Sequence, residues 1–191
     1  MNDIEKQYVY DVYNEISDEF SSTRQYPWPT VKSFIKSLQP FSLVCDVGSG
    51  NGKNMFRNDL IFTATDISEQ MCNLSITKTP HTIQSNVLHL PFKDNTFDSV
   101  ICIACIHHLN THERRYNAIK ECLRILKPEG KILISLWANS DKYGNGDQFI
   151  KWNRNRTKRF YHLYSEAEVK NICKDFNLIH SFDKHNYYLT N

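Results

Sequence analysis

The sequence predicts an α/β fold in which seven mostly parallel strands form a sheet with helices on both faces. The first observation is an apolar strand, Leu43–Val47, that runs directly into a glycine-rich loop. The second is another apolar strand, Ile61–Thr65, that ends in Asp66, twenty residues after Asp46. A doubly wound sheet begins with such a strand, loop and acid. The third observation is that strand-like and helix-like stretches then alternate to the end of the chain.

The segment before the first strand is expected to be helical. Apolar residues recur at every fourth position from Ile4 to Phe20, which predicts an amphipathic helix that covers the sheet. Thr23–Pro29 contains two prolines that favour an extended chain. A second helix is predicted between Val31 and Leu38, where the apolar residues share one face.

The later elements follow from apolar runs and from helix end signals. Asn110 and Glu113 are spaced as a capping box before a helix over residues 112–126, which stops at a Pro and a Gly. Ser165 and Glu168 have the same spacing before a helix that ends near Phe176. The remaining predicted strands are Thr82–Asn86, Phe97–Ile103, Lys131–Trp137, Leu178–Phe182 and Tyr187–Thr190.

The loop after the first strand predicts a ligand site. Glycines let the backbone turn sharply and approach a ligand that a Cβ would repel, and here they stand at Gly48, Gly50 and Gly52. Asp46 offers an acceptor for an ammonium group. Asp66 is placed to hold ribose hydroxyls, because a carboxylate can accept from two at once. Two plainer interpretations stay open: a tight strand-to-helix turn for the loop, and an N-cap role for Asp66.

Composition limits the classes of function. A chain of 191 residues with 40% hydrophobic content suffices for one globular domain over residues 1–191. The acidic, polar start is unlike a signal peptide, and the longest apolar run, Val100–Ile106, is too short to span a bilayer. We therefore expect no membrane attachment and a cytoplasmic protein, with the nucleus as a further location. The six cysteines lie within strand or helix patterns, so we expect them to be reduced.

Cys102 and Cys105 are followed by His107 and His108, a pattern that raises the hypothesis of a zinc site. Structural zinc needs four ligands, normally from two spaced pairs, and the chain has no second pair of this kind. Cys102 also belongs to a predicted buried strand. We therefore expect no metal in this chain.

Residues 138–158 are polar, contain two glycines and are expected to form a mobile loop over the site. A basic cluster without acids overlaps its end, beside Trp152, and consists of Lys151, Arg154, Arg156, Lys158 and Arg159. Cations that neutralise phosphates, next to rings that stack on bases, are typical of RNA-facing segments. A solvated loop remains the alternative.

The glycine loop reads D-x-G-x-G-x-G, with Lys53 where a dinucleotide fingerprint would have its third glycine. With the Phe97-Asp98 start of the fourth strand, it resembles the class I methyltransferases, which have a Rossmann-like sheet and use S-adenosylmethionine. Nearly the whole chain resembles a narrower family, the eukaryotic tRNA wobble-uridine carboxymethyl methyltransferases. The stretches that carry this resemblance are Val12–Ile16, Thr23-Arg24, Pro27-Trp28-Pro29, Asp46–Lys53, Ile103-Ala104, His107-His108-Leu109, Glu113-Arg114-Arg115 and Arg159–Tyr164.

This resemblance implies methyl transfer from S-adenosylmethionine to the carboxylate of 5-carboxymethyluridine at the wobble position of a tRNA anticodon loop, which gives the methyl ester. Residues 1–40 would form a helical lid near the cofactor. Asn86 stands where the class usually has Asp, and its amide oxygen can still accept from the adenine amino group. The implied cofactor-binding residues are Asp46, Gly48, Gly50, Gly52, Asp66, Asn86, Val87 and Ile103.

The implied catalytic residues are Arg24, His107, Arg159, Tyr161 and His162. A carboxylate is already a nucleophile at neutral pH, so the site needs cations to orient it and rings to clamp the uracil. Arg24 and Arg159 can give bidentate contacts, and Trp28, Trp137 and Tyr161 can stack. A packing role stays open for His107. A small-molecule methyltransferase and an inactive RNA-binding scaffold are the competing functions.

The resembling family works with a small zinc-binding activator subunit, so we expect a heterodimer in which the zinc belongs to the partner. In the strand order of the class, Thr82–Asn86 lies at an edge of the sheet, and it has no charge or proline to discourage edge pairing. Val87, Leu88, Leu90 and Phe92 would add an exposed apolar patch. We expect the partner to pair along this edge, and cover by the chain's own loops is the alternative.

Overall fold

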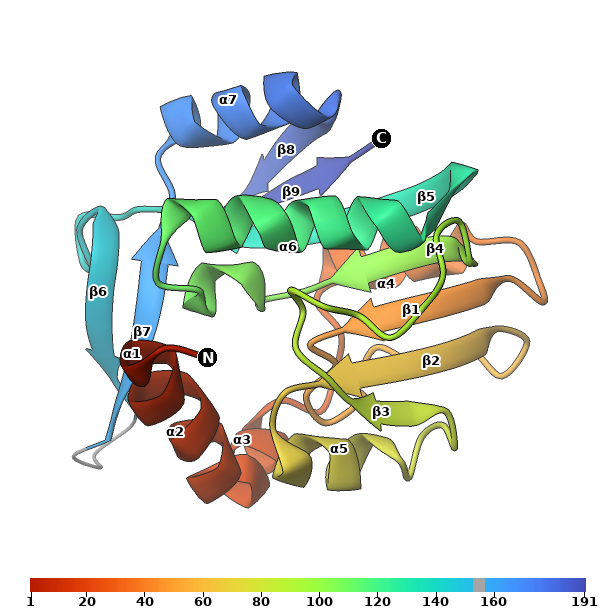
Figure 1. The fold of residues 1–191 in the computed structure, drawn as a ribbon, viewed down its shortest axis with the longest axis horizontal. Helices are drawn as coiled ribbons and strands as arrows, with labels where there is room; N and C mark the ends of the chain where they lie inside the picture. The colour runs from red at the N-terminus through yellow and green to blue at the C-terminus, as the bar shows by residue number, and fades with distance from the viewer. Residues whose placement is uncertain (153–156) are drawn as a thin grey trace.

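The computed structural model describes residues 1–152 and 157–191. Figure 1 shows a central sheet flanked by helices, with the N-terminal helices and a separate hairpin facing the arrowheads of its first strands. The helices are α1 (Asp3–Glu5), α2 (Asp11–Glu15), α3 (Ser17–Thr23), α4 (Pro29–Lys36), α5 (Glu69–Ser75), α6 (His112–Ile125) and α7 (Glu166–Phe176), with a π-helical turn over Lys6–Tyr10 and a 3-10 turn over Ile106–His108. The strands are β1 (Leu43–Val47), β2 (Ile61–Asp66), β3 (Thr82–Gln84), β4 (Phe97–Cys102), β5 (Leu126–Trp137), β6 (Gly146–Lys151), β7 (Lys158–Leu163), β8 (Ile179–Asp183) and β9 (Asn186–Thr190).

Seven of these strands form one sheet in the order β3-β2-β1-β4-β5-β9-β8. All neighbours from β3 to β5 are parallel, and β9 is antiparallel to both β5 and β8. Asp46 pairs with Ala64 of β2 and with Ile101 of β4, so the ends of three strands meet beside the glycine loop. The predicted seven-stranded, mostly parallel α/β sheet is confirmed.

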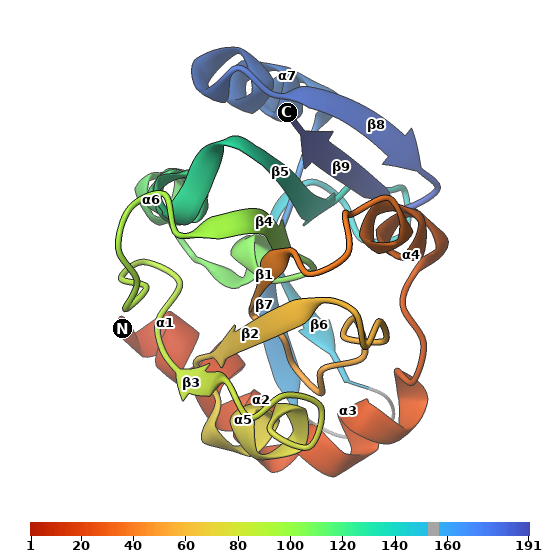
Figure 2. The same ribbon diagram turned by 90° about the vertical axis from the view of Figure 1, so that its right-hand side faces the viewer.

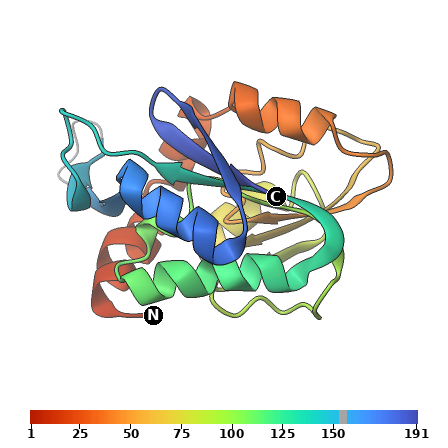
Figure 3. The same ribbon diagram turned by 90° about the horizontal axis from the view of Figure 1, so that it is seen from above.

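Helices cover both faces of the sheet, as predicted. Seen from above, α4 lies on one face and α6 and α7 lie on the other (Figure 3). On the α4 side, Val31 and Ile35 have no exposed surface and pack with Val44 and Leu133. Burying an aliphatic side chain of this size contributes about 1.5–3 kcal/mol, so this face alone fixes α4 against the strands.

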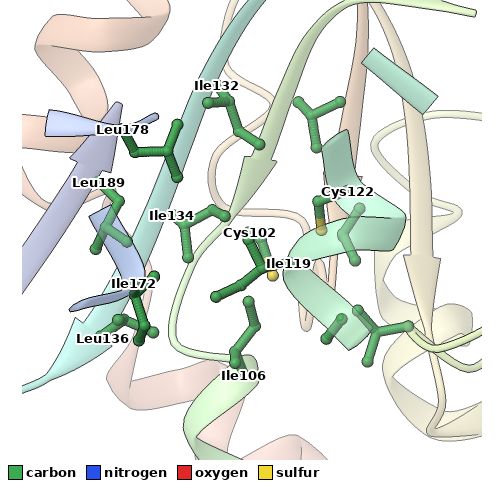
Figure 4. Packing of buried hydrophobic residues seen from close by; sticks show 14 of the residues in the cluster. Cys102, Ile106, Ile119, Cys122, Ile132, Ile134, Leu136, Ile172, Leu178 and Leu189 are labelled. Carbon is green, nitrogen blue, oxygen red and sulfur yellow. The ribbon is translucent and has the colours of Figure 1, made fainter. Parts of the chain in front are cut away.

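The larger core lies on the opposite face (Figure 4). Ile119 and Cys122 of α6 pack against Ile132 and Ile134 of β5, and Ile172 of α7 lies in the same cluster. All are at most 2% exposed, which is why the central strands read as continuous apolar runs in the sequence. This core supports the floor of the site from below.

Several boundaries differ from the predictions. The N-terminal helix is not continuous: it passes through the π-helical turn and breaks at Ile16, whose φ and ψ are −96° and 9°. Asn110 does not cap α6; Thr111 does, by accepting from the Arg114 N–H. The fifth strand begins at Leu126, earlier than predicted. The capping box of Ser165 before α7 is present.

The predicted loop over 138–158 is wrong over much of its length, because β6 and β7 form an antiparallel hairpin. Phe149 faces Phe160 across the ladder. Trp152 at the end of β6 is 3% exposed and packs with Val12 and Ile16 of the N-terminal helices. Burial of these apolar side chains stabilises the hairpin. The polar residues around them in the sequence led to the prediction of a loop.

The predicted basic cluster is also changed by the hairpin. Lys151 and Lys158 are exposed opposite each other, but Arg159 is buried beneath them. Trp152 is likewise buried, so it cannot stack on a base in this conformation. Arg154 and Arg156 lie outside the described residues.

β3 lies at one edge of the sheet, with α5 beside it (Figure 2), as predicted. The expected apolar patch behind it is wrong: Val87 and Leu90 are buried, and Leu88 and Phe92 pack on the core. Only Ile83 of this group is well exposed, at 38%. Among the described residues, no helix is long and apolar enough to cross a membrane.

Candidate functional site

A cavity of about 640 Å³ opens at the carboxyl ends of β1, β2 and β4. The glycine loop and the segments after β2 and β4 form its floor, and the N-terminal helices and β7 form its walls. The predicted residues that line it are Arg24, Gly48, Gly50, Asp66, Asn86, Val87, Ile103, His107, Arg159 and Tyr161. Asp46, Gly52 and His162 do not line it, for reasons that differ.

The glycine loop depends on missing side chains. Gly48, Gly50 and Gly52 have φ of +69°, +55° and +74°, a region that other residues rarely adopt. A Cβ on Gly48 would stand 2.6 Å from Cys105 Sγ, which shows how closely the loop approaches the segment after β4. Gly52 packs against the side chains of Met55 and Lys78, so it supports the loop without lining the cavity.

Asp46 lies directly behind the loop and is fully buried. Its Oδ2 accepts a 3.3 Å hydrogen bond from Asn54 Nδ2, and its Oδ1 has no partner among the described residues. Burial raises the pKa of this carboxyl to about 7, and the Asn54 bond opposes that shift. A buried carboxylate with an open oxygen fits the ammonium end of S-adenosylmethionine.

Asp66 shapes the loop as well as lining the cavity. Its Oδ2 accepts from the Gly50 N–H and its Oδ1 from the Ser68 N–H, both at 2.9 Å. Ser68, not Asp66, is the N-cap of α5, because its Oγ accepts from the Met71 N–H. The N-cap alternative for Asp66 is therefore wrong, and its remaining lone pairs face the cavity where ribose hydroxyls are expected.

Ser85 and Asn86 follow β3 and line the same cavity. Asn86 Oδ1 accepts from the Leu88 N–H at 3.0 Å, which fixes the amide within its own turn. The Ser85 hydroxyl is buried without a partner among the described residues. This hydroxyl is a second polar group available to an adenine ring. No motif in the sequence indicated a role for Ser85.

The opposite wall carries cations. The Arg159 guanidinium lies 4.5 Å from the Trp152 ring centre and 5.0 Å from that of Tyr161, and its Nε has no partner among residues 1–152 and 157–191. Arg24 lies 4.6 Å from the same Trp152 ring. In the described part of the chain, no acid comes within 4.0 Å of either guanidinium. Burial and then repulsion by Arg159 lower the pKa of Arg24.

A hydrogen-bond relay orients Arg159. His108 Nδ1 lies 2.7 Å from the Phe160 carbonyl oxygen, which can only accept, so Nδ1 carries the proton. Burial lowers the pKa of His108 to about 3, so its Nε2 is an acceptor and the Tyr13 hydroxyl donates to it at 3.0 Å. The Tyr13 oxygen then accepts from Arg159 Nη1 at 3.2 Å. Tyr13 thus holds one guanidinium nitrogen and leaves the others for a ligand.

His107 is 3% exposed, and its ring lies among those of His108, Trp137 and Tyr161. Its Nδ1 has no partner among the described residues. Burial, with nearby His108 and Arg159, lowers the pKa of His107 well below its ordinary value. The ring is therefore neutral, and it can offer a hydrogen bond but no charge.

His162 is placed elsewhere than predicted. Its ring nitrogens lie 2.7 Å from Asp147 Oδ1 of β6 and 3.0 Å from Glu168 Oε1 of α7. Alternation along β7 explains this: Arg159 and Tyr161 face the cavity, and His162 faces the other side. His162 joins β6, β7 and α7 and does not line the cavity.

Sequence reasoning missed Tyr13, Lys53 and His108 as site residues, although all three line the cavity. Lys53 adjoins the glycine loop, and its position in the pattern was the available signal. Tyr13 is brought in by a helix 95 residues before His108, which no local spacing reveals. No group of three or more metal-ligating side chains occurs among residues 1–152 and 157–191.

Comparison with known proteins agrees with this geometry. Residues 45–134 match the family described as "Methyltransferase domain". A tRNA (carboxymethyluridine(34)-5-O)-methyltransferase from Xenopus tropicalis, ALKBH8, is 41% identical over 150 residues, which cover 78% of this chain and 24% of that protein. The chain thus spans about a quarter of the length of that relative, and 26% and 22% of its counterparts from Macaca fascicularis and Mus musculus.

Solved structures share the fold. A SAM-dependent methyltransferase from Methanosarcina mazei has a TM-score of 0.73 at 17% identity and covers 86% of this chain and 97% of its own. The methyltransferase in a complex with the Haloferax volcanii Trm112 activator has a TM-score of 0.67 at 18% identity, over 92% of this chain and 78% of its own. The sheet is that of the class I methyltransferases, and S-adenosylmethionine is the cofactor of this fold.

A relative of similar length shows to which methyltransferase family the chain belongs. The tRNA (carboxymethyluridine(34)-5-O)-methyltransferase of Schizosaccharomyces pombe is 31% identical over 219 residues, which cover 97% of this chain and 96% of that protein. The similarity therefore includes the N-terminal helices and the β6–β7 hairpin as well as the sheet. This chain belongs to the tRNA (carboxymethyluridine(34)-5-O)-methyltransferase family.

Proposed function

We propose that this protein methylates the carboxylate of 5-carboxymethyluridine at the wobble position of a tRNA anticodon and so forms the methyl ester. The observation that carries the proposal is Arg159, a 7% exposed cation with an open Nε and no acid partner in the described chain. A buried guanidinium without a counterion is costly unless a ligand supplies one. The carboxylate of this substrate is such a counterion, and family membership supports the choice.

The groups in the site suit a methyl transfer to a carboxylate, which requires no general base. S-adenosylmethionine supplies an electrophilic methyl group on its sulfonium. A substrate carboxylate oxygen bonds to the methyl carbon as the carbon–sulfur bond breaks, and the electron pair of that bond stays on sulfur. No proton moves, which agrees with neutral His107 and His108 beside the cations. The work of the chain is to orient two charged reactants and exclude water.

Named side chains divide that work. Arg159, held by Tyr13, and Arg24 orient the carboxylate from one wall. Tyr161 and Trp137, whose ring centres are 4.8 Å apart, offer apolar faces for the uracil, and His107 offers a hydrogen bond beside them. The glycine loop, with Asp66, holds the cofactor opposite.

The direct test is a methylation assay. The purified chain is incubated with S-adenosylmethionine and tRNA that carries 5-carboxymethyluridine, and the nucleosides are separated by mass spectrometry. We expect the methyl ester to appear only with both reactants present. Methylation of a free small-molecule carboxylate but not of the tRNA would favour the small-molecule alternative. Cofactor binding without any transfer, with or without a partner subunit, would favour the scaffold.

The same proposal includes a small zinc-binding activator subunit as partner, with the zinc held by the partner. Support comes from the Haloferax volcanii complex, in which a methyltransferase of this fold is bound to the Trm112 activator. The edge strand β3 is short, has an exposed Ile83, and is the proposed contact. Because the predicted apolar patch behind β3 is absent from the described surface, we expect backbone hydrogen bonds along β3 to make the larger contribution to this contact.

A further inference from the structure

Lys53 is a third cation at the cavity, and the transfer described above gives it no task. It follows Gly52 directly, its N–H donates to Asn51 Oδ1 at 3.3 Å, and it lines the cavity. Its ammonium lies 5.2 Å from the ring centre of Trp28. No ion pair to Lys53 occurs among the described residues.

The three cations do not form one cluster. Arg24 and Arg159 share the Trp152 ring, at 4.6 and 4.5 Å, whereas Lys53 stacks on a different ring, Trp28. Burial lowers the pKa of Lys53, with a further lowering by Arg24 and an opposing effect of Asp46. Lys53 therefore lies at the glycine-loop end of the cavity, beside Trp28 and within electrostatic reach of Asp46 and Arg24.

Two carboxylates enter this cavity in the proposed reaction. One belongs to the substrate uridine, and the other is the α-carboxylate of the cofactor's methionine part. The amino-acid end of the cofactor is a zwitterion, with an ammonium and a carboxylate on one carbon. At the glycine loop the chain has the complementary pair: the ammonium-bearing Lys53 lines the cavity, and Asp46, whose Oδ1 has no partner among the described residues, is buried directly behind the loop.

We propose that Lys53 binds the α-carboxylate of S-adenosylmethionine and leaves the Arg24–Arg159 pair free for the substrate carboxylate. This proposal depends on the proposed function only in requiring that the chain binds S-adenosylmethionine, so it can be tested without RNA. Gly48 holds the loop close to Cys105, and Lys53 follows the loop directly and lines the same cavity. The site would discriminate the intact cofactor from one that lacks the carboxylate.

The test is titration calorimetry of the full chain, without RNA, with S-adenosylhomocysteine and with its analogue that lacks the α-carboxylate. Lys53→Met keeps the length of the side chain and removes its charge. We expect it to weaken S-adenosylhomocysteine binding about tenfold or more, which corresponds to about 1.4 kcal/mol, and to leave binding of the analogue unchanged. Lys53→Arg should restore most of the affinity.

The matched control is Lys78→Met, since Lys78 packs its methylenes near Gly52, is exposed and does not line the cavity. Equal weakening of both ligands by Lys53→Met would mean loop damage and would overturn the proposal. Unchanged binding of both ligands would overturn it too. None of these outcomes depends on whether the tRNA ester is formed.

Discussion

In the proposed function, Arg159 is the residue on which substrate recognition depends most. Its guanidinium is buried, flanked by Trp152 and Tyr161, and fixed at one nitrogen by Tyr13. Replacement by Met should lower kcat/KM for tRNA by an amount equal to about 2–5 kcal/mol, because a partly desolvated carboxylate loses its counterion. Binding of S-adenosylhomocysteine should stay within twofold.

Steady-state methylation kinetics and calorimetry check this pair of expectations, with Lys120→Met, an exposed site on α6, as the charge-matched control. Tyr13→Phe and Arg159→Lys should combine non-additively, since the first residue acts by holding the second. Normal kinetics for Arg159→Met at limiting tRNA would contradict the assignment.

Asp46 makes the stability of the ligand-free protein depend on pH. Burial raises its pKa from 3.8 to about 7, so the unfolded state releases the proton first as the pH rises. Stability should therefore fall from about pH 4 to pH 7 through this group and change little above that, with about 1.4 kcal/mol for each unit of raised pKa. Asp46→Asn does not titrate, so its advantage over the native chain should grow across this range.

Urea unfolding of both proteins at a series of pH values measures that difference directly. The Asn variant should also bind the cofactor more weakly, because the open oxygen becomes part of a neutral amide. A stability difference that is constant from pH 5 to pH 8 would show that Asp46 is already ionised in the folded protein.

At the scale of elements, the β6–β7 hairpin is separate from the seven-stranded sheet, and side-chain links join it to neighbouring elements. His162 of β7 links it to α7 through Glu168 and to β6 through Asp147. His162→Ala should lower the free energy of unfolding by about 0.5–1.5 kcal/mol, since a buried imidazole and two partly exposed carboxylates lose their hydrogen bonds. Unfolding in urea measures this loss, with the exposed His89→Ala as control.

The same variant separates the two roles considered for His162. A structural link predicts that methylation at saturating substrate is retained at low temperature, where the variant stays folded. A variant that is stable but inactive would instead support a catalytic role for His162.

Element predictions succeeded where the signal was local. The capping box of Ser165 and Glu168 is a reciprocal pair within one turn, and the structure has it. The hairpin was missed because Trp152 is buried against helices from the start of the chain, a contact that a local sequence pattern does not reveal. Asn110 failed as a cap because Thr111, one position later, offers the same chemistry.

The site shows the same division between local and distant information. Gly48, Gly50 and Asp66 could be placed from spacing alone, since one loop and two strand ends bring them together. Tyr13 and the orientation of Arg159 could not, because they depend on how the N-terminal helices meet β7. The sidedness of His162 required a strand that the sequence did not predict.

At the scale of the whole molecule, the edge strand β3 predicts a partner. Co-expression with a small zinc-binding activator should yield a soluble heterodimer, and Ile83→Lys should weaken it, because a Lys on an edge opposes strand pairing. Ile179→Lys, on β8 at the other edge, is the control. Size-exclusion chromatography reports the result, and a chain that is monodisperse and fully active alone would rule this partner out.

The central claim is that the methyl group goes to a carboxylate of the wobble uridine. Methyl-labelled S-adenosylmethionine and tRNA that carries 5-carboxymethyluridine are incubated with the native chain or with Arg159→Met, and the wobble nucleoside is examined by mass spectrometry before and after mild alkali. We expect a labelled nucleoside that alkali converts back to 5-carboxymethyluridine, and almost none with the variant. Label that resists alkali, or label at another nucleoside, would contradict the account.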